Sequence, residues 1–168
     1  MFKEIDITEL DCNAVDLFNN KWALVTAGDS DAYNTMTVSW GAMGELWGKP
    51  MATIYIRPQR YTEEFLNSND YFTVSVYPAE LKKQIHSICG SKSGRDVDKA
   101  KECNITPCFD EKAPYFEEAE IVLICKKAAK SQFDPSQFID SEIDGSVYPT
   151  KDYHFIYYGE IEKVLISK

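Results

Sequence analysis

Six short runs rich in β-branched and aromatic residues constrain the fold of this chain most strongly. They span residues 21–28, 34–41, 51–58, 70–78, 120–129 and 154–166. Turn residues such as Gly28-Asp29, Gly48-Lys49-Pro50 and Pro78 separate them. Short strands between regular turns are typical of a β-sandwich or β-barrel rather than of alternating β/α units. We therefore expect a mainly β fold with a few short flanking helices, in a single domain over residues 1–168.

The segments between these runs predict few helices. The clearest covers residues 78–90, with Pro78 at its start, Gly90 at its end and apolar residues at helical spacing. Thr62 is expected to cap a short helix over EEFLNSN, and DVDKAKECN predicts another turn of helix. The stretches 41–48 and 131–152 read as loops.

One run has a pattern of its own. In residues 73–77, Thr73, Ser75 and Tyr77 alternate with two valines. Such alternation is typical of a strand that is buried on one face only.

Composition excludes several classes of function. A formal net charge of −9 over 168 residues argues against a broad nucleic-acid surface, which is normally basic. No apolar run is long enough for a membrane helix, and the N-terminal MFKEIDITELD has no apolar signal core. We therefore expect a cytoplasmic protein.

The five cysteines are expected to be reduced and mostly buried. No CxxC occurs, and the two histidines, His86 and His154, are far apart in sequence. A zinc site needs ligands in close pairs, so no metal site is predicted. Cys89 is a candidate redox thiol, but no second cysteine is near it in sequence.

The segment 91–99, SKSGRDVDK, concentrates cations, hydroxyls and flexible backbone in an acidic chain. Exposed backbone N–H groups, hydroxyls, a guanidinium and an ammonium all suit a phosphate group. The residues that supply them are Gly90, Ser91, Ser93, Gly94, Arg95 and Lys99. Alternatively the segment is a solvated turn, because Asp96 and Asp98 partly neutralise it.

Two further stretches show a similar mixture. In IRPQRYT, Arg57 and Arg60 bracket a proline turn and Thr62 adds a hydroxyl, although both arginines are also plausible surface charges. In NTMTVSWG, alternation separates threonine and serine from Met36, Val38 and Trp40. That stretch also fits an ordinary amphipathic barrel strand. Taken together, the three stretches suit a phosphorylated aromatic cofactor.

These motifs identify a resemblance. The stretches NTMTVSWGAMGELWGKPMATIYIRPQRYT, FTVSVYPAELKKQI, CGSKSGRDVDK, FEEAEIVLIC and YHFIYYGEIEKV resemble the flavin reductase-like FMN-binding family, and within it the flavoredoxin-type proteins. The resemblance runs from about Trp22 to the C-terminus. It implies a split β-barrel that binds FMN non-covalently and usually forms a homodimer.

The resemblance also implies site residues. Along the isoalloxazine and ribityl chain it places Asn34, Met36, Thr37, Ser39 and Trp40. A second wall would consist of Arg57, Arg60, Tyr61 and Thr62, of which Arg57 would favour the anionic reduced flavin. Near the phosphate, or at the outer edge of the site, would lie Ser93, Gly94, Arg95 and Lys99, with Cys89 and Gly90 at the entry. His154 is the candidate catalytic residue, for a proton or a substrate contact; alternatively it is a hydrogen-bonded histidine at the start of a strand.

Three functions follow from this reading. The first is an FMN-dependent oxidoreductase that takes hydride transiently from NAD(P)H and reduces flavin or a small acceptor. The second is an electron carrier that shuttles electrons between protein partners, for which an acidic surface suits docking to a basic partner. The third is a barrel domain without a cofactor. It is the least favoured of the three, because such a domain would not need the cations of the loop.

Overall fold

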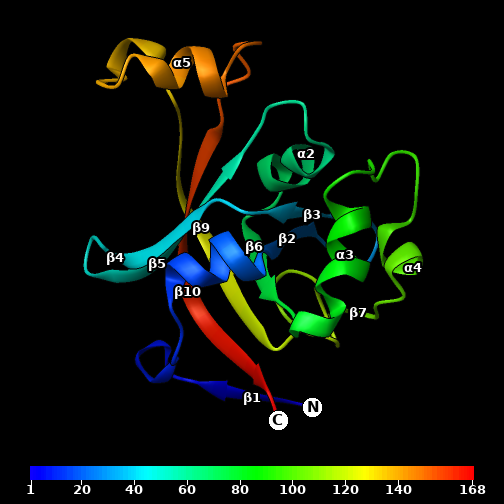
Figure 1. The fold of residues 1–168 in the computed structure, drawn as a ribbon. Coiled ribbons are helices and arrows are strands. Elements are labelled where there is room, and N and C mark those ends of the chain that lie inside the picture. Colours follow the sequence, from blue (N-terminus) through cyan, green and yellow to red (C-terminus); the bar gives the residue numbers. More distant parts are fainter.

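A curled antiparallel sheet forms the centre of the computed structural model, which describes residues 1–168 (Figure 1). Seven strands follow one another in the order β3-β2-β6-β9-β10-β5-β4, and β1 pairs with β10. All six runs predicted from the sequence form strands of this sheet, which confirms the mainly β fold. The strands are β1 Phe2–Ile5, β2 Ala23–Gly28, β3 Tyr33–Val38, β4 Gly41–Leu46, β5 Lys49–Ile56, β6 Tyr71–Val76, β9 Ile121–Gln132 and β10 Phe155–Ser167.

A link of two residues makes this sheet a barrel. The strands at its two edges, β3 and β4, are joined only by Ser39 and Trp40. Because so short a link holds the edges together, the sheet has to roll up on itself. β3 and β4 do not pair with each other, so the barrel is split along that side.

Two apolar clusters lie on the two faces of the sheet. The larger one fills the barrel, with Val25, Ile54 and Phe72 at its centre. The smaller one packs the outer face against α3 and α4, through residues such as Leu24 and Ile85. Strand β6 is therefore buried on both faces, and the expectation that one face of it is exposed is wrong.

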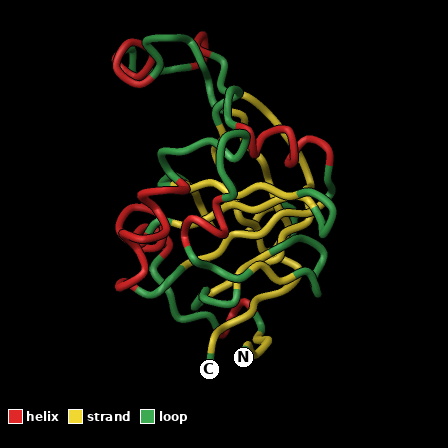
Figure 2. The backbone as a smooth tube through the Cα atoms, turned by 90° about the vertical axis from the view of Figure 1, so that its right-hand side faces the viewer, coloured by secondary structure: helices red, strands yellow, loops and turns green.

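The helices are short and lie around the sheet (Figure 2). They are η1 Ile7–Glu9, α1 Ala14–Asp16, η2 Leu17–Lys21, α2 Tyr61–Ser68, η3 Ala79–Leu81, α3 Lys82–Cys89, α4 Lys99–Cys103, η4 Pro135–Gln137 and α5 Glu142–Val147, and a small hairpin joins β7 Pro107–Cys108 to β8 Tyr115–Phe116. The helices predicted near residues 78–90 and 96–104 are confirmed. None of the helices has the length and apolar composition needed to cross a membrane.

Two segments read as loops are structured. Residues 41–46 form β4, which pairs with β5 in a hairpin that turns at Trp47 and Gly48. Both turn residues have positive φ, 59° and 72°, so the glycines of this segment mark a hairpin rather than a loop. Residues 131–152 contain the end of β9 and helix α5, which lies at the tip of an arm formed with β10 (Figure 1).

Candidate functional site

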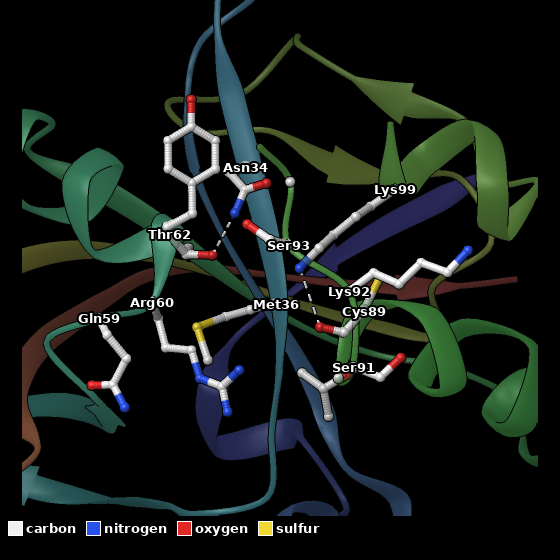
Figure 3. Close-up of a pocket in the computed structure, with 14 residues that line it drawn as sticks. Asn34, Met36, Gln59, Arg60, Thr62, Cys89, Ser91, Lys92, Ser93 and Lys99 are labelled. Atoms are coloured by element: carbon white, nitrogen blue, oxygen red, sulfur yellow. Dashed lines mark hydrogen bonds between the residues drawn. The ribbon is translucent and has the colours of Figure 1, made fainter. Parts of the chain in front are cut away.

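A polar pocket opens where β3, the start of α2 and the loop after α3 meet (Figure 3). Its volume is about 140 Å³ and fourteen residues line it. Eleven of them belong to the fifteen residues that the resemblance assigned to the cofactor. These eleven are Asn34, Met36, Thr37, Arg60, Tyr61, Thr62, Cys89, Gly90, Ser93, Gly94 and Lys99, and the other three are Gln59, Ser91 and Lys92.

The charge of the pocket is opposite to that of the protein. Arg60, Lys92 and Lys99 line it, and no aspartate or glutamate does. Lys92 forms an ion pair with Glu102 at 3.1 Å, whereas neither Arg60 nor Lys99 lies within 4.0 Å of a carboxylate. A chain with a net charge of −9 therefore keeps two uncompensated cations at one pocket.

Lys99 is the more unusual of the two, because it is buried with 7 % of its surface exposed. Its Nζ donates hydrogen bonds to the carbonyl oxygens of Thr35 at 2.8 Å and Cys89 at 3.2 Å. An ammonium has three N–H donors, so one remains for a ligand. Burial lowers the pKa of Lys99, because a charged group loses hydration there. An anion in the pocket would offset that cost.

Asn34 joins β3 to α2 at the same place. Its Nδ2 donates to Thr62 Oγ1 at 2.7 Å, and both side chains are buried. Thr62 is the second residue of α2, and Arg60 takes the cap position. The prediction that Thr62 caps this helix is therefore wrong, and its hydroxyl instead fixes one wall of the pocket.

His86 supports the opposite wall. Its Nδ1 lies 2.8 Å from Thr37 Oγ1, and its ring is nearly perpendicular to that of Trp22, with ring centres 5.6 Å apart. Burial and then Lys82 lower the pKa of His86 to about 4, so the ring is neutral at neutral pH. It orients Thr37 from behind and does not line the pocket.

A second, apolar cavity lies next to the β3–β4 link. Its volume is about 530 Å³, and Ser39 and Trp40 line it rather than the polar pocket. Its other walls come from α1, η2, β4, β5 and the arm that carries α5. They are formed by Val15, Phe18, Asn19, Gly41, Tyr55, Phe133, Phe138, Ile143, Val147 and Tyr148.

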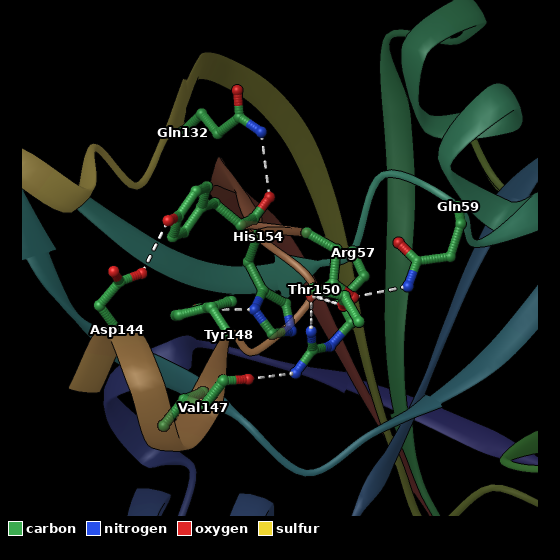
Figure 4. Close-up of polar contacts among 10 residues, drawn as sticks. Arg57, Gln59, Gln132, Asp144, Val147, Tyr148, Thr150 and His154 are labelled. Atoms are coloured by element: carbon green, nitrogen blue, oxygen red, sulfur yellow. Dashed lines mark hydrogen bonds and ion pairs between the residues drawn. The ribbon is translucent and has the colours of Figure 1, made fainter. Parts of the chain in front are cut away.

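Arg57 belongs to a network of polar contacts that also includes Gln59 and Val147 (Figure 4). It forms an ion pair with Asp152, and its Nη2 donates to the carbonyl oxygen of Val147 at 3.1 Å. Gln59 Nε2 donates to the same carboxylate at 2.7 Å. These bonds, from Gln59 and then Arg57, hold the pKa of Asp152 well below its usual range. The network joins Gln59 of the polar pocket to Val147 of the apolar cavity, and it neutralises the charge expected to act on a flavin.

His154 lies behind the apolar cavity. Its Nδ1 is 2.8 Å from the hydroxyl of Tyr148, and its ring centre is 4.9 Å from that of Trp40. Burial and then Arg57 lower the pKa of His154 to about 4. The side chain lines neither cavity, so the catalytic role expected from the sequence stays a prediction. In the structure His154 packs against Trp40 and Tyr148 and thereby supports both side chains.

Arg95 also lies outside the polar pocket. Its guanidinium pairs with Glu64 and stands 4.4 Å from the centre of the Tyr61 ring. The sequence reading did not single out Gln59 or Lys92, which do line the pocket. Gln59 lies in sequence between Arg57 and Arg60, and Lys92 between Ser91 and Ser93. Only the path of the backbone shows which side chains of these stretches point into the pocket.

Comparison with known proteins places this arrangement in a family. A family model described as the flavin reductase like domain matches residues 15–168. The chain belongs to the flavin reductase-like family. No curated protein matches it significantly.

Solved structures share the fold of this flavin reductase-like chain. A flavoredoxin from Methanosarcina acetivorans superposes with a TM-score of 0.69 at 21% identity, over 88% of this chain and 69% of that one. An FMN-binding domain of a flavin reductases-like enzyme from Shewanella baltica gives 0.68 at 17%, over 99% and 77%. An FMN-binding protein from Thermus thermophilus, with bound 1-cyclohex-2-enone, gives 0.66 at 22%, over 85% and 68%. The split-barrel fold implied by the resemblance is thereby confirmed.

Proposed function

We propose that this protein binds FMN and uses it as an oxidoreductase, with NAD(P)H as a transient hydride donor and a small molecule as acceptor. The observation that carries the proposal is the polar pocket, where three cations and no carboxylate gather in a protein of net charge −9. The phosphate of FMN is the part of the cofactor that needs such a pocket. The family match and the FMN-binding relatives support the same ligand.

The residues present fit a phosphate and a polyol chain. Arg60 and the remaining N–H of Lys99 would hold the phosphate, together with the hydroxyls of Ser91 and Ser93. Asn34 and Thr37 offer polar groups to the ribityl chain. The pocket volume of about 140 Å³ suits this part of FMN rather than its three rings, which would extend past Met36 towards Trp40.

The chemistry is that of the flavin, which when bound accepts hydride and passes it on. This chain's own residues position the cofactor and shape the access to it. Arg57 and Asp152 keep the arm in place between the two cavities, and His154 holds Trp40 and Tyr148. Both histidines are neutral at neutral pH, since their pKa values lie near 4.

The apolar cavity would take the acceptor. Nine of its twelve lining residues are hydrophobic and no charged side chain lines it, which favours a small apolar or aromatic molecule. The Thermus thermophilus relative was solved with bound 1-cyclohex-2-enone, a ligand of this class.

A second candidate is electron transfer between proteins. The flavoredoxin from Methanosarcina acetivorans has the same fold, and the net charge of −9 suits docking to a basic partner. In that case FMN would stay bound and exchange electrons with a protein rather than with NAD(P)H.

We also propose a homodimer. The β4–β5 hairpin exposes 62% of Trp47, a surface that a second copy of the chain would cover. Light scattering after size-exclusion chromatography tests this: twice the chain mass of 19.2 kDa is expected, and a monodisperse monomer would contradict it.

The deciding experiment mixes the FMN-loaded protein with NADPH and then with NADH under anaerobic conditions. Rapid loss of the visible flavin absorption is expected from an NAD(P)H-dependent oxidoreductase. A flavin that stays oxidised with both donors, yet is bleached by dithionite, would favour the electron carrier. A titration with FMN comes before this experiment, and failure of the protein to bind FMN in it would overturn both candidates.

A further inference from the structure

Two cysteines that are distant in sequence meet beside the polar pocket. The Sγ atoms of Cys89 and Cys103 lie 3.6 Å apart, and both side chains are buried. Cys89 is the last residue of α3 and Cys103 the last residue of α4. Their separation of 14 residues hid this pair from the sequence analysis.

The chain between the two sulfurs contains the whole proposed phosphate loop. Residues 90–98 connect α3 to α4, and Cys89 itself lines the pocket. Lys99, at the start of α4, donates to the Cys89 carbonyl oxygen at 3.2 Å. A bond between the sulfurs would therefore close a ring around the loop and its buried cation.

We propose that Cys89 and Cys103 form a disulfide when a hydroperoxide enters the polar pocket of the FMN-free protein, and that bound FMN prevents this by covering Cys89. The second half rests on the proposed function, whereas the first half does not. The pair would make the phosphate loop a redox-sensitive part of the protein.

The reaction balances with the hydroperoxide as oxidant. The pair first loses one proton to solvent, and the remaining proton crosses the S–H···S contact to Cys103, which leaves Cys89 as the thiolate. The Cys89 sulfur attacks one oxygen of hydrogen peroxide, the O–O bond breaks, and a sulfenic acid and hydroxide form, the hydroxide taking up the released proton. The Cys103 sulfur then displaces the hydroxyl group, which gives the S–S bond. The two thiol protons end in the two water molecules released, and both electrons go to the peroxide.

The surroundings suit this chemistry. Either sulfur can donate in the S–H···S contact, so the proton can sit on either one. The contact with Cys89, and then the charge of Lys99, lower the pKa of Cys103, whereas the contact with Cys103, and then burial, raise the pKa of Cys89. The pair therefore ionises first at Cys103, and the proton left on Cys89 has to cross to Cys103 before Cys89 can attack. The sulfurs have to approach from 3.6 Å to about 2.05 Å, a change that side-chain rotation and a small shift of two short helices can supply.

Cys125 provides a matched control. It is fully buried in the barrel interior, lines neither cavity, and its thiol bonds only to the Leu123 carbonyl oxygen. Burial raises the pKa of Cys125, which disfavours the reactive thiolate. An oxidant that enters through the polar pocket should leave it untouched.

The test treats the FMN-free protein with hydrogen peroxide and follows intact mass and proteolytic peptides. Loss of two hydrogen atoms and a peptide pair linking Cys89 to Cys103 are expected in the wild type and in Cys125→Ser. In Cys103→Ser, Cys89 should instead give a sulfenic acid that dimedone traps. If the Cys103→Ser variant does not fold, Cys103→Ala replaces it, with the same expected result. The proposal would be overturned if other cysteines are oxidised and the linked peptides do not appear. It would also be overturned if no cysteine reacts with peroxide.

A second arm repeats the oxidation with saturating FMN, after fluorescence quenching has established binding. The disulfide is expected to form at least tenfold more slowly. An unchanged rate with FMN bound would overturn the access route through the pocket. If FMN does not bind, the proposed function and the protective half fail together, while the first arm still decides whether the disulfide forms.

Discussion

The backbone of Gly94 lies against the side chain of Asn34, so closely that a Cβ atom at Gly94 would come within 1.9 Å of the Asn34 Oδ1. Asn34 cannot simply turn away, because it is buried and its Nδ2 is bonded to Thr62 at 2.7 Å. The approach brings the loop of residues 90–98 onto β3 and thereby forms one side of the polar pocket. Glycine is required here for space rather than for a positive φ.

Gly94→Ala is therefore expected to push the loop away from β3. FMN affinity should fall at least about tenfold, which corresponds to about 1.4 kcal/mol. Fluorescence titration measures this, with Gly145→Ala as the control, because an added Cβ there meets nothing within 4 Å. Equal FMN affinity in both variants would show that the loop does not form the FMN site.

Arg60 and Arg95 allow a comparison between an arginine that lines the polar pocket and one that lies outside it. Arg60 lines the pocket without a carboxylate partner, whereas Arg95 pairs with Glu64 outside it. We expect Arg60→Ala to weaken FMN binding about tenfold, since a hydrogen bond to a charged group is worth about 1.5–3 kcal/mol before solvent screening. Arg95→Ala should change the affinity by less than about threefold, because exposed ion pairs contribute about 0–1 kcal/mol. The reverse order would move the phosphate site to Arg95.

The sequence predicted the strands well because each run carries its own period and its own turns. It failed where packing decides: β6 reads as half-exposed until the β7–β8 segment covers its polar face, where Thr73 donates to the Pro114 carbonyl oxygen, and β4 reads as a loop until β5 pairs with it. The three motifs that line the polar pocket could be singled out because each is continuous in sequence. The pairing of Cys89 with Cys103, and the distance of His154 from both cavities, depend on how separate elements pack, which no local pattern encodes.

Two buried histidines predict a loss of stability in mild acid. The pKa values of His86 and His154 are lowered from 6.5 to about 4, so the unfolded chain binds more protons than the folded one between these values. Their contribution is complete above pH 6.5 and declines as the pH falls to about 4. The free energy of unfolding should drop by up to about 1.4 kcal/mol per pH unit for each histidine. Asp152 changes the slope only at lower pH, because the stability it contributes is complete above its ordinary pKa of 3.8 and is lost as the pH falls below that value.

Urea unfolding of the FMN-free protein at several pH values across this window measures the slope. His154→Gln and His86→Gln should each remove about half of it, whatever their stability at neutral pH. A wild-type slope near zero would mean that both rings are hydrated and protonate as in the unfolded chain.

The arm offers a test of the acceptor cavity that does not touch the polar pocket. Phe138 lines the apolar cavity and stacks on Tyr148, with ring centres 6.0 Å apart, while its neighbour Ile139 is fully exposed. Phe138→Ala is expected to raise the KM for a small quinone about tenfold, because burying an aromatic side chain against a ligand contributes about 1.5–3 kcal/mol when complete and less here. Ile139→Ala should leave KM unchanged. FMN affinity should be the same in both variants, since neither residue lines the polar pocket. A fall in FMN affinity on Phe138→Ala, with the quinone KM unaltered, would instead assign the apolar cavity to the flavin ring and leave the acceptor to approach from elsewhere.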